Sequence, residues 1–91
     1  MTKDSARKEA YRRDIIARTK MARELRNFKQ HKVAKTLGIS LEMYKSYENR
    51  TPLPHYLIEP WTMIMGVSIE WLITGEEVQR VIPMARKIVS G

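Results

Sequence analysis

The sequence predicts an all-α protein with one small domain. Apolar residues recur at intervals of three or four along most of the 91-residue chain, and period-two alternation of β-branched residues is absent. Glycine and proline occur four times each, mostly where the apolar periodicity breaks, so they mark boundaries between helices. A chain of this length builds a single core, and without cysteine that core must be held by side-chain packing alone.

Charge and composition restrict the classes of function. The net charge is +7. Residues 1–32 hold eleven Lys and Arg against four Asp and Glu, whereas residues 33–91 hold six of each, so the whole surplus is N-terminal. Nucleic acid is the usual partner of a small basic protein. The charged start and the lack of a long apolar run predict a cytoplasmic protein with neither a signal peptide nor a membrane span.

No pattern in the chain indicates catalysis. His31 and His55 are far apart in sequence, and no acidic residue lies at a spacing that would complete a metal site or a catalytic relay. We therefore expect no enzymatic activity, no metal, no cofactor and no small-molecule substrate.

The first predicted elements are a flexible segment and a helix. Residues 1–10 are polar and basic, and we expect them to be flexible. Residues 11–75 form the expected domain. Within it, Tyr11, Ile15, Ala22 and Leu25 recur at helical spacing and predict a helix that ends at Asn27, a residue that tolerates the left-handed conformation.

Two short helices around a glycine follow. Val33, Ala34 and Leu37 share one face of a helix predicted over residues 30–37, and Gly38 allows the positive φ of a sharp turn. Ser40 is placed to cap a helix over residues 41–48. Residues 30–48 thus read as a helix-turn-helix, a motif whose second helix enters the major groove of DNA.

The next predicted helix spans residues 57–65 and follows a loop over residues 50–54. Pro60 is acceptable only within the first turn of that helix, because proline lacks a backbone N–H. Ser68 can cap a single-turn helix that Gly75 ends. The large side chains Trp61 and Trp71 lie at helical spacings typical of core residues.

The last segment, residues 76–91, is predicted as an amphipathic helix interrupted by Pro83. Three uses of its apolar stripe stay open: covering its own core, pairing in a homodimer, or gripping another regulator. The stripe consists of Val78, Val81, Ile82, Ala85, Ile88 and Val89.

Many positions coincide with one family of regulators. Over residues 14–75 the sequence resembles the Cro and λ-repressor-like helix-turn-helix regulators, also called the XRE family. The resemblance is carried by Gln30, Val33-Ala34, Leu37-Gly38-Ile39-Ser40, Tyr47-Glu48-Asn49, Pro52, Gly66-Val67-Ser68, Trp71-Leu72 and Thr74-Gly75. It implies a five-helix, λ-repressor-like domain that binds duplex DNA, generally as a two-fold dimer, and controls transcription.

The resemblance also implies roles for single residues. Arg23 and Glu48 match a structural ion pair. Gln30 matches a phosphate contact, and Asn49 either matches another or simply ends its helix. The residues expected to face base edges are Ser40, Leu41, Glu42, Lys45 and Ser46, and those expected to face phosphate are Lys29, Gln30, Asn49, Arg50, Arg12 and Arg13. The basic N-terminal residues, Arg18 included, lie either along phosphates or on a solvated helix face.

Some positions depart from the family pattern and favour a second hypothesis. Lys29 stands where a capping Ser or Thr is common, the recognition helix is electrically neutral, and residues 51–56 contain no Lys or Arg. The alternative function is an antiactivator that binds another transcription factor. Its candidate contact residues are Leu41, Met43, Leu53, Tyr56, Val78 and Ile82. Leu53 and Tyr56 could instead pack beneath their own loop.

Overall fold

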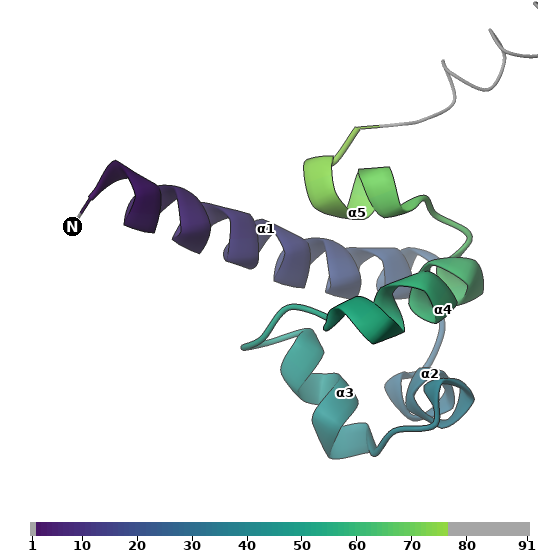
Figure 1. The fold of residues 1–91 in the computed structure, drawn as a ribbon. Helices are drawn as coiled ribbons and strands as arrows, with labels where there is room; N and C mark the ends of the chain where they lie inside the picture. The colour runs from purple at the N-terminus through teal and green to yellow at the C-terminus, as the bar shows by residue number, and fades with distance from the viewer. Residues whose placement is uncertain (1, 77–91) are drawn as a thin grey trace, which may run out of the picture.

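The structure is a computed structural model that describes residues 2–76, and within that range every regular element is a helix (Figure 1). The all-α prediction is therefore confirmed. The predictions for Val78, Ile82 and the rest of residues 77–91 lie outside the described residues. The helices are α1 (Lys3–Leu25), α2 (Gln30–Leu37), α3 (Leu41–Tyr47), α4 (His55–Met65) and α5 (Ile69–Thr74).

Helix α1 begins much earlier than predicted, so the expectation of a flexible segment over residues 1–10 is wrong from Lys3 onward. The Thr2 hydroxyl accepts a hydrogen bond from the Ser5 backbone N–H at 3.1 Å, and Asp4 lies in the positively polarised first turn. The cap and the dipole stabilise a helix that has little apolar surface to bury. Figure 1 shows this N-terminal half projecting past the other helices.

The C-terminal half of α1 packs against the domain. Ile15, Thr19 and Ala22 are buried, and the Thr19 hydroxyl donates to the Ile15 carbonyl at 2.7 Å, which satisfies its polar group inside the core. The helix ends as predicted, because Asn27 adopts a left-handed φ of 60°.

The core lies where α1, α2, α3, α4 and α5 meet. Trp61, Tyr44, Met65 and Leu72 are fully buried, and the Trp61 Nε1 donates to the Tyr44 hydroxyl at 3.3 Å. Trp61 is thus a core residue, as predicted. Trp71 was also predicted as core, but it is only half-buried and lies at the edge, packed against the cluster from outside.

Two arginines, Arg18 of α1 and its C-cap residue Arg26, bind the C-terminal ends of α5 and α4. Arg26 Nε donates to the Met65 carbonyl at 2.7 Å, and Arg18 Nη1 donates to the carbonyls of Leu72 and Ile73 at 3.1 and 3.0 Å. The last carbonyls of a helix lack intrahelical partners and carry partial negative charge, so these guanidinium groups cap both helices. Arg18 therefore has a structural role in the fold, which neither of the two interpretations left open by the sequence included.

Helix α4 starts at His55 rather than near Leu57, with Pro54 as its N-cap residue. Pro60 consequently lies inside the helix, and its predicted place in the first turn is wrong. Proline offers no N–H to the Tyr56 carbonyl, which costs the helix a hydrogen bond. The burial of Leu57 and Trp61, one turn apart on the core side, outweighs this cost.

Candidate functional site

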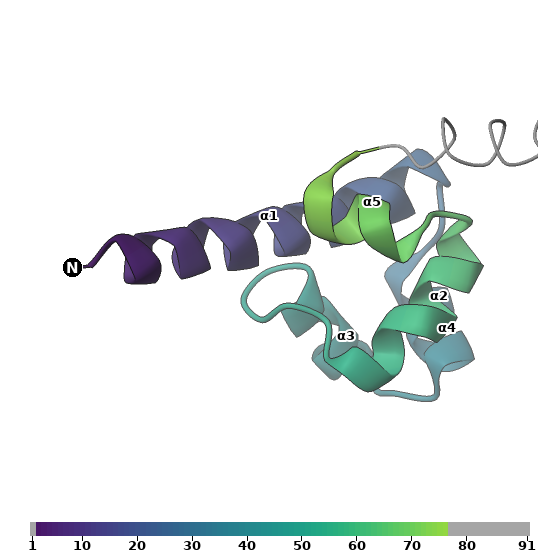
Figure 2. The ribbon, with the colours of Figure 1, turned by 45° about the horizontal axis from the view of Figure 1, so that its top comes forward.

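A tight corner joins α2 to α3. Gly38 has φ 75°, the left-handed conformation that glycine adopts without strain, and the Ile39 N–H donates to the Ala34 carbonyl at 3.0 Å. The Ser40 hydroxyl then accepts from the Met43 N–H at 3.1 Å and caps α3. The predicted roles of Gly38 and Ser40 are confirmed. Figure 2 shows α2 and α3 as separate helices on either side of this corner.

Helix α3 has a buried side and an open side. Tyr44 and Tyr47 are buried against the domain, whereas Leu41 and Met43 are 38% and 45% exposed. Glu42 and Lys45 are exposed as well. The hydroxyls of Ser40 and Ser46 already bond to backbone, since Ser46 donates to the Met43 carbonyl at 2.6 Å. Of the predicted base-facing set, Leu41, Glu42 and Lys45 therefore present the more available groups.

Glu48 receives hydrogen bonds from three helices. Arg23 of α1 makes two contacts, with Nε 2.7 Å from Oε2 and Nη2 3.0 Å from Oε1. Gln30 of α2 donates from Nε2 to Oε1 at 3.1 Å, and the Tyr44 hydroxyl of α3 also bonds to Glu48. The structure thus contains the ion pair that the family resemblance implied, within a larger network that satisfies a buried carboxylate.

Tyr44 is the member of this network that the sequence reasoning missed. Burial, the hydrogen bond to Glu48 and the negative charge of that carboxylate together raise the pKa of Tyr44 well above its ordinary value. The signal that could have found it is the spacing, because residues 44 and 48 are one helical turn apart and face the same way.

The predicted phosphate-facing residues around α3 differ in their exposure and in the hydrogen bonds that they already make. The Gln30 amide is oriented by Glu48, and Lys29 is the exposed N-cap residue of α2 with no side-chain cap bond. The Asn49 Nδ2 donates to the Lys45 carbonyl at 2.8 Å, which matches the helix-ending interpretation of that residue. Arg50 is exposed in the following loop.

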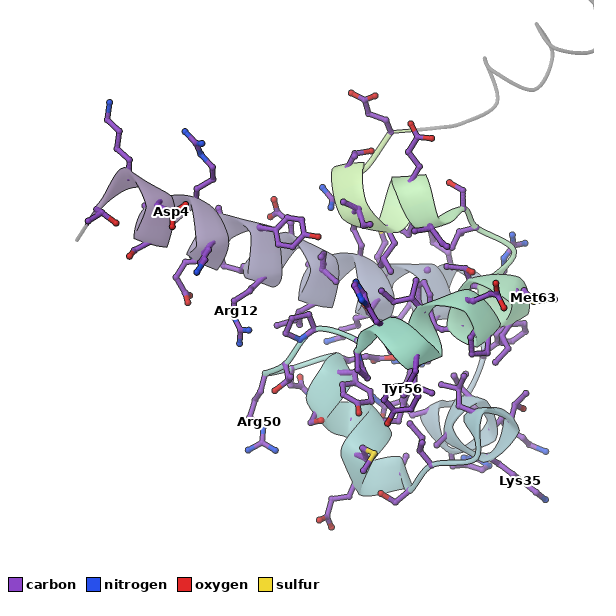
Figure 3. The ribbon with its side chains drawn as sticks, viewed as in Figure 1. Asp4, Arg12, Lys35, Arg50, Tyr56 and Met63 are labelled. Carbon is purple, nitrogen blue, oxygen red and sulfur yellow. The ribbon has the colours of Figure 1, made fainter. Side chains whose placement is uncertain are left out.

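Arg12 and Arg13 lie on different sides of α1. In Figure 3, Arg12 extends from the projecting half of α1 toward the side of the molecule that carries Arg50 and α3. Arg13 shares a helical stripe with Ala17, Lys20 and Glu24, all exposed, on the side away from the core. Of these two arginines, only Arg12 is placed on the same side as α3.

The candidate protein-contact residues are divided by burial. Leu53 is only 5% exposed and belongs to the hydrophobic core, so its prediction as a contact residue is wrong. Tyr56 is 70% exposed and hydrogen-bonds to Tyr47, which lies one turn from Met43 along α3. Burial and the adjacent Tyr56 raise the pKa of Tyr47. Met43 and Tyr56 are therefore both close to the buried Tyr47.

Within residues 2–76, no helix combines the length and apolarity that crossing a membrane requires. The same range holds no group of three or more His, Cys, Asp or Glu side chains arranged to bind a metal ion. Comparison with protein families, curated proteins and solved structures finds no match to this chain.

Proposed function

We propose that this protein is a helix-turn-helix transcriptional regulator of the Cro and λ-repressor-like kind, which binds duplex DNA with α3 in the major groove. The observation that carries the proposal is the state of α3, whose inner side is fixed by Tyr44 and Glu48 while its outer side stays open. A helix held in this way can enter a groove without rearranging the domain. Neither catalysis nor a cofactor is part of this proposal.

The exposed chemistry of α3 supplies the base contacts. Glu42 accepts a hydrogen bond from a cytosine amino group, Lys45 donates to guanine, and Leu41 contacts a thymine methyl group. Lys29, Gln30, Arg50 and Arg12 supply the phosphate contacts, with Arg12 and Arg50 on the side of the molecule that carries α3 (Figure 3). Phosphate contacts provide affinity and orientation, while the three α3 side chains provide sequence preference.

The experiment is a binding titration across a salt series, with the DNA upstream of the protein's own gene and a random duplex. The proposal expects a preference for one sequence and a log–log salt slope of about −0.9 per phosphate contacted. Lys45→Ala should reduce the preference by about 1–3 kcal/mol. Lys35→Ala is the matched control, since Lys35 extends from α2 on the side away from α3 (Figure 3). The proposal would be contradicted if the natural protein, Lys45→Ala and Lys35→Ala all bound equally well and without preference for either DNA.

A second function is favoured by the apolar groups near α3. Leu41, Met43 and Tyr56 are exposed, and residues 51–56 contain no Lys or Arg that would bind phosphate. Such a surface, with Glu42 and Lys45 beside it, suits a protein partner. In this alternative the protein is an antiactivator that binds another transcription factor.

The alternative is tested by co-purification of the protein with an activator from its native cells. Leu41→Lys or Tyr56→Ala should abolish the complex. Met63→Ala, which removes a 76% exposed side chain from a different part of α4, should leave it intact. Retention of the activator by all variants, or capture of DNA alone, would exclude this function.

A further inference from the structure

A groove of about 320 Å³ lies between the C-terminal half of α1 and α5. It is lined by Ala22, Leu25, Arg26, Val67 and Trp71. Ala22 is buried, whereas Leu25 is 77% exposed and Trp71 is half-buried. Met21, which precedes Leu25 by one helical turn, is 49% exposed. This groove has no role in the proposed DNA contacts, since it is formed by neither α2 nor α3.

The charged residue in the lining, Arg26, already makes hydrogen bonds within the protein. Arg26 donates from Nε to the Met65 carbonyl and from Nη2 to the Gly66 carbonyl, so its guanidinium caps α4. The rest of the lining is aliphatic or aromatic. The groove therefore favours an apolar occupant over an anionic one.

The chain leaves α5 beside one end of this groove. Gly75 ends α5 with φ 79°, and a Cβ atom added there would lie 2.8 Å from Arg18 Nη2. Ala22 is one turn beyond Arg18 on α1 and Leu25 is two turns beyond, a distance of about 10 Å. The segment that follows, residues 77–91, repeats apolar side chains at helical spacing, beginning with Val78 and Ile82.

We propose that this groove is the docking site of the chain's own segment 77–91, which places Val78 and Ile82 over Leu25 and Trp71. The segment is long enough to reach, because only about two turns of α1 separate Arg18 from Leu25. It is also tethered at the groove's edge. Tethering gives it an effective concentration in the millimolar range, which favours it over the same segment of a second copy.

Engineered cysteines test this proposal directly in the full-length chain, since the natural sequence has none. The pair Leu25→Cys with Ile82→Cys should form an intramolecular disulfide under mild oxidation, seen as a faster-migrating monomer on non-reducing gels. The control pair is Leu25→Cys with Arg80→Cys, because residue 80 falls opposite the apolar stripe. We expect the first pair to close about tenfold faster than the control. Disulfide-linked dimers, or equal rates for both pairs, would overturn the proposal.

Tryptophan fluorescence gives a second readout that requires no cross-link. Trp61 is fully buried, so changes in emission report on Trp71. Ile82→Asp should shift the emission to longer wavelength and increase quenching by iodide, whereas Arg80→Asp should leave both unchanged. Unchanged emission in Ile82→Asp at undiminished helical content would overturn the docking. DNA binding is independent of these outcomes, so failure here leaves the proposed function standing.

Discussion

At the scale of single residues, Glu48 determines how α3 is held. It follows α3 directly and binds Arg23 from α1 and Gln30 from α2, so one carboxylate fixes the orientation of three helices. Its side chain is 1% exposed and that of Arg23 is 13% exposed. Such a pair adds little net stability compared with apolar residues of equal size, but removing one member leaves the other charge without its partner.

We expect Glu48→Gln to lower the free energy of unfolding by about 2–3 kcal/mol, less than the loss of a fully buried pair because Arg23 keeps some contact with water. Urea denaturation measures this change. Glu9→Gln, which alters an exposed carboxylate on α1, should stay within about 0.5 kcal/mol of the natural protein. An effect of Glu48→Gln as small as that of the control would show that the network does not bear on stability.

Tyr44 predicts how stability depends on alkaline pH. Its pKa is raised in the folded state, mainly by burial, so the unfolded chain loses the phenolic proton at lower pH than the folded one. The stabilisation is complete below the ordinary tyrosine pKa of about 10. It is lost as the pH rises above that value. Tyr47 contributes in the same direction.

We expect Tyr44→Phe to be less stable at pH 7 by about 1–2 kcal/mol, because the buried Trp61 N–H and Glu48 each lose a hydrogen-bond partner. The stability of Tyr44→Phe should nevertheless fall less steeply than that of the natural protein between about pH 9 and pH 11, the range around the ordinary tyrosine pKa. Thermal unfolding at a series of pH values measures both effects. The same alkaline slope in Tyr44→Phe and in Tyr11→Phe, an exposed site, would contradict this assignment.

At the scale of the elements, α4 contains its own weak point. Pro60 is the sixth residue of α4 and gives the Tyr56 carbonyl no N–H to bind. Pro60→Ala should stabilise the protein by about 1–2 kcal/mol, since the gain in helix propensity exceeds the lost restriction of the unfolded chain. Chemical denaturation measures the gain. Pro54→Ala, at the N-cap of the same helix, should give no such gain, and a neutral or destabilising Pro60→Ala would contradict the argument.

Local chemistry explains which elements could be predicted from the sequence. The short helices α2, α3 and α5 end at Gly38, Glu48 and Gly75, and side chains of serine cap α3 and α5. Glycine and serine act within a few residues of themselves, so their effects can be read from the sequence alone.

The features that could not be predicted depend on contacts between distant parts of the chain. Leu57 and Trp61 of α4 and Leu53 of the preceding loop are buried in one core cluster with residues of the other helices. Arg18 resembles its basic neighbours in the sequence, and only its contact with α5 reveals its role. The projecting half of α1 has no apolar periodicity, and its helical state rests on a cap at Thr2.

At the scale of the whole molecule, the N-terminal charge surplus is arranged around a helix instead of along a flexible arm. Arg12→Ala should therefore reduce the magnitude of the DNA-binding salt slope by about 0.9, the effect of one phosphate contact. Arg13→Ala is the matched control, because Arg13 is next to Arg12 in the sequence but lies on the side of α1 away from the core. The salt slope of this variant should equal that of the natural protein. The salt-series titration measures both. Equal losses for the two variants would mean that charge acts through the general field of the protein and not through a positioned contact.

Helix α1 has 23 residues, and its packed half removes the cost of nucleating its exposed half. The projecting turns are thus ordered at folding, before any partner arrives. A basic arm that becomes ordered only on binding loses conformational entropy at that moment, and its affinity falls accordingly. In this protein α1, about 34 Å long, already holds its arginines in fixed positions. Shortening α1 from the N-terminus by single helical turns should weaken DNA binding in steps. The size of each step should depend on whether the basic residue removed lies on the side of α1 that faces the DNA.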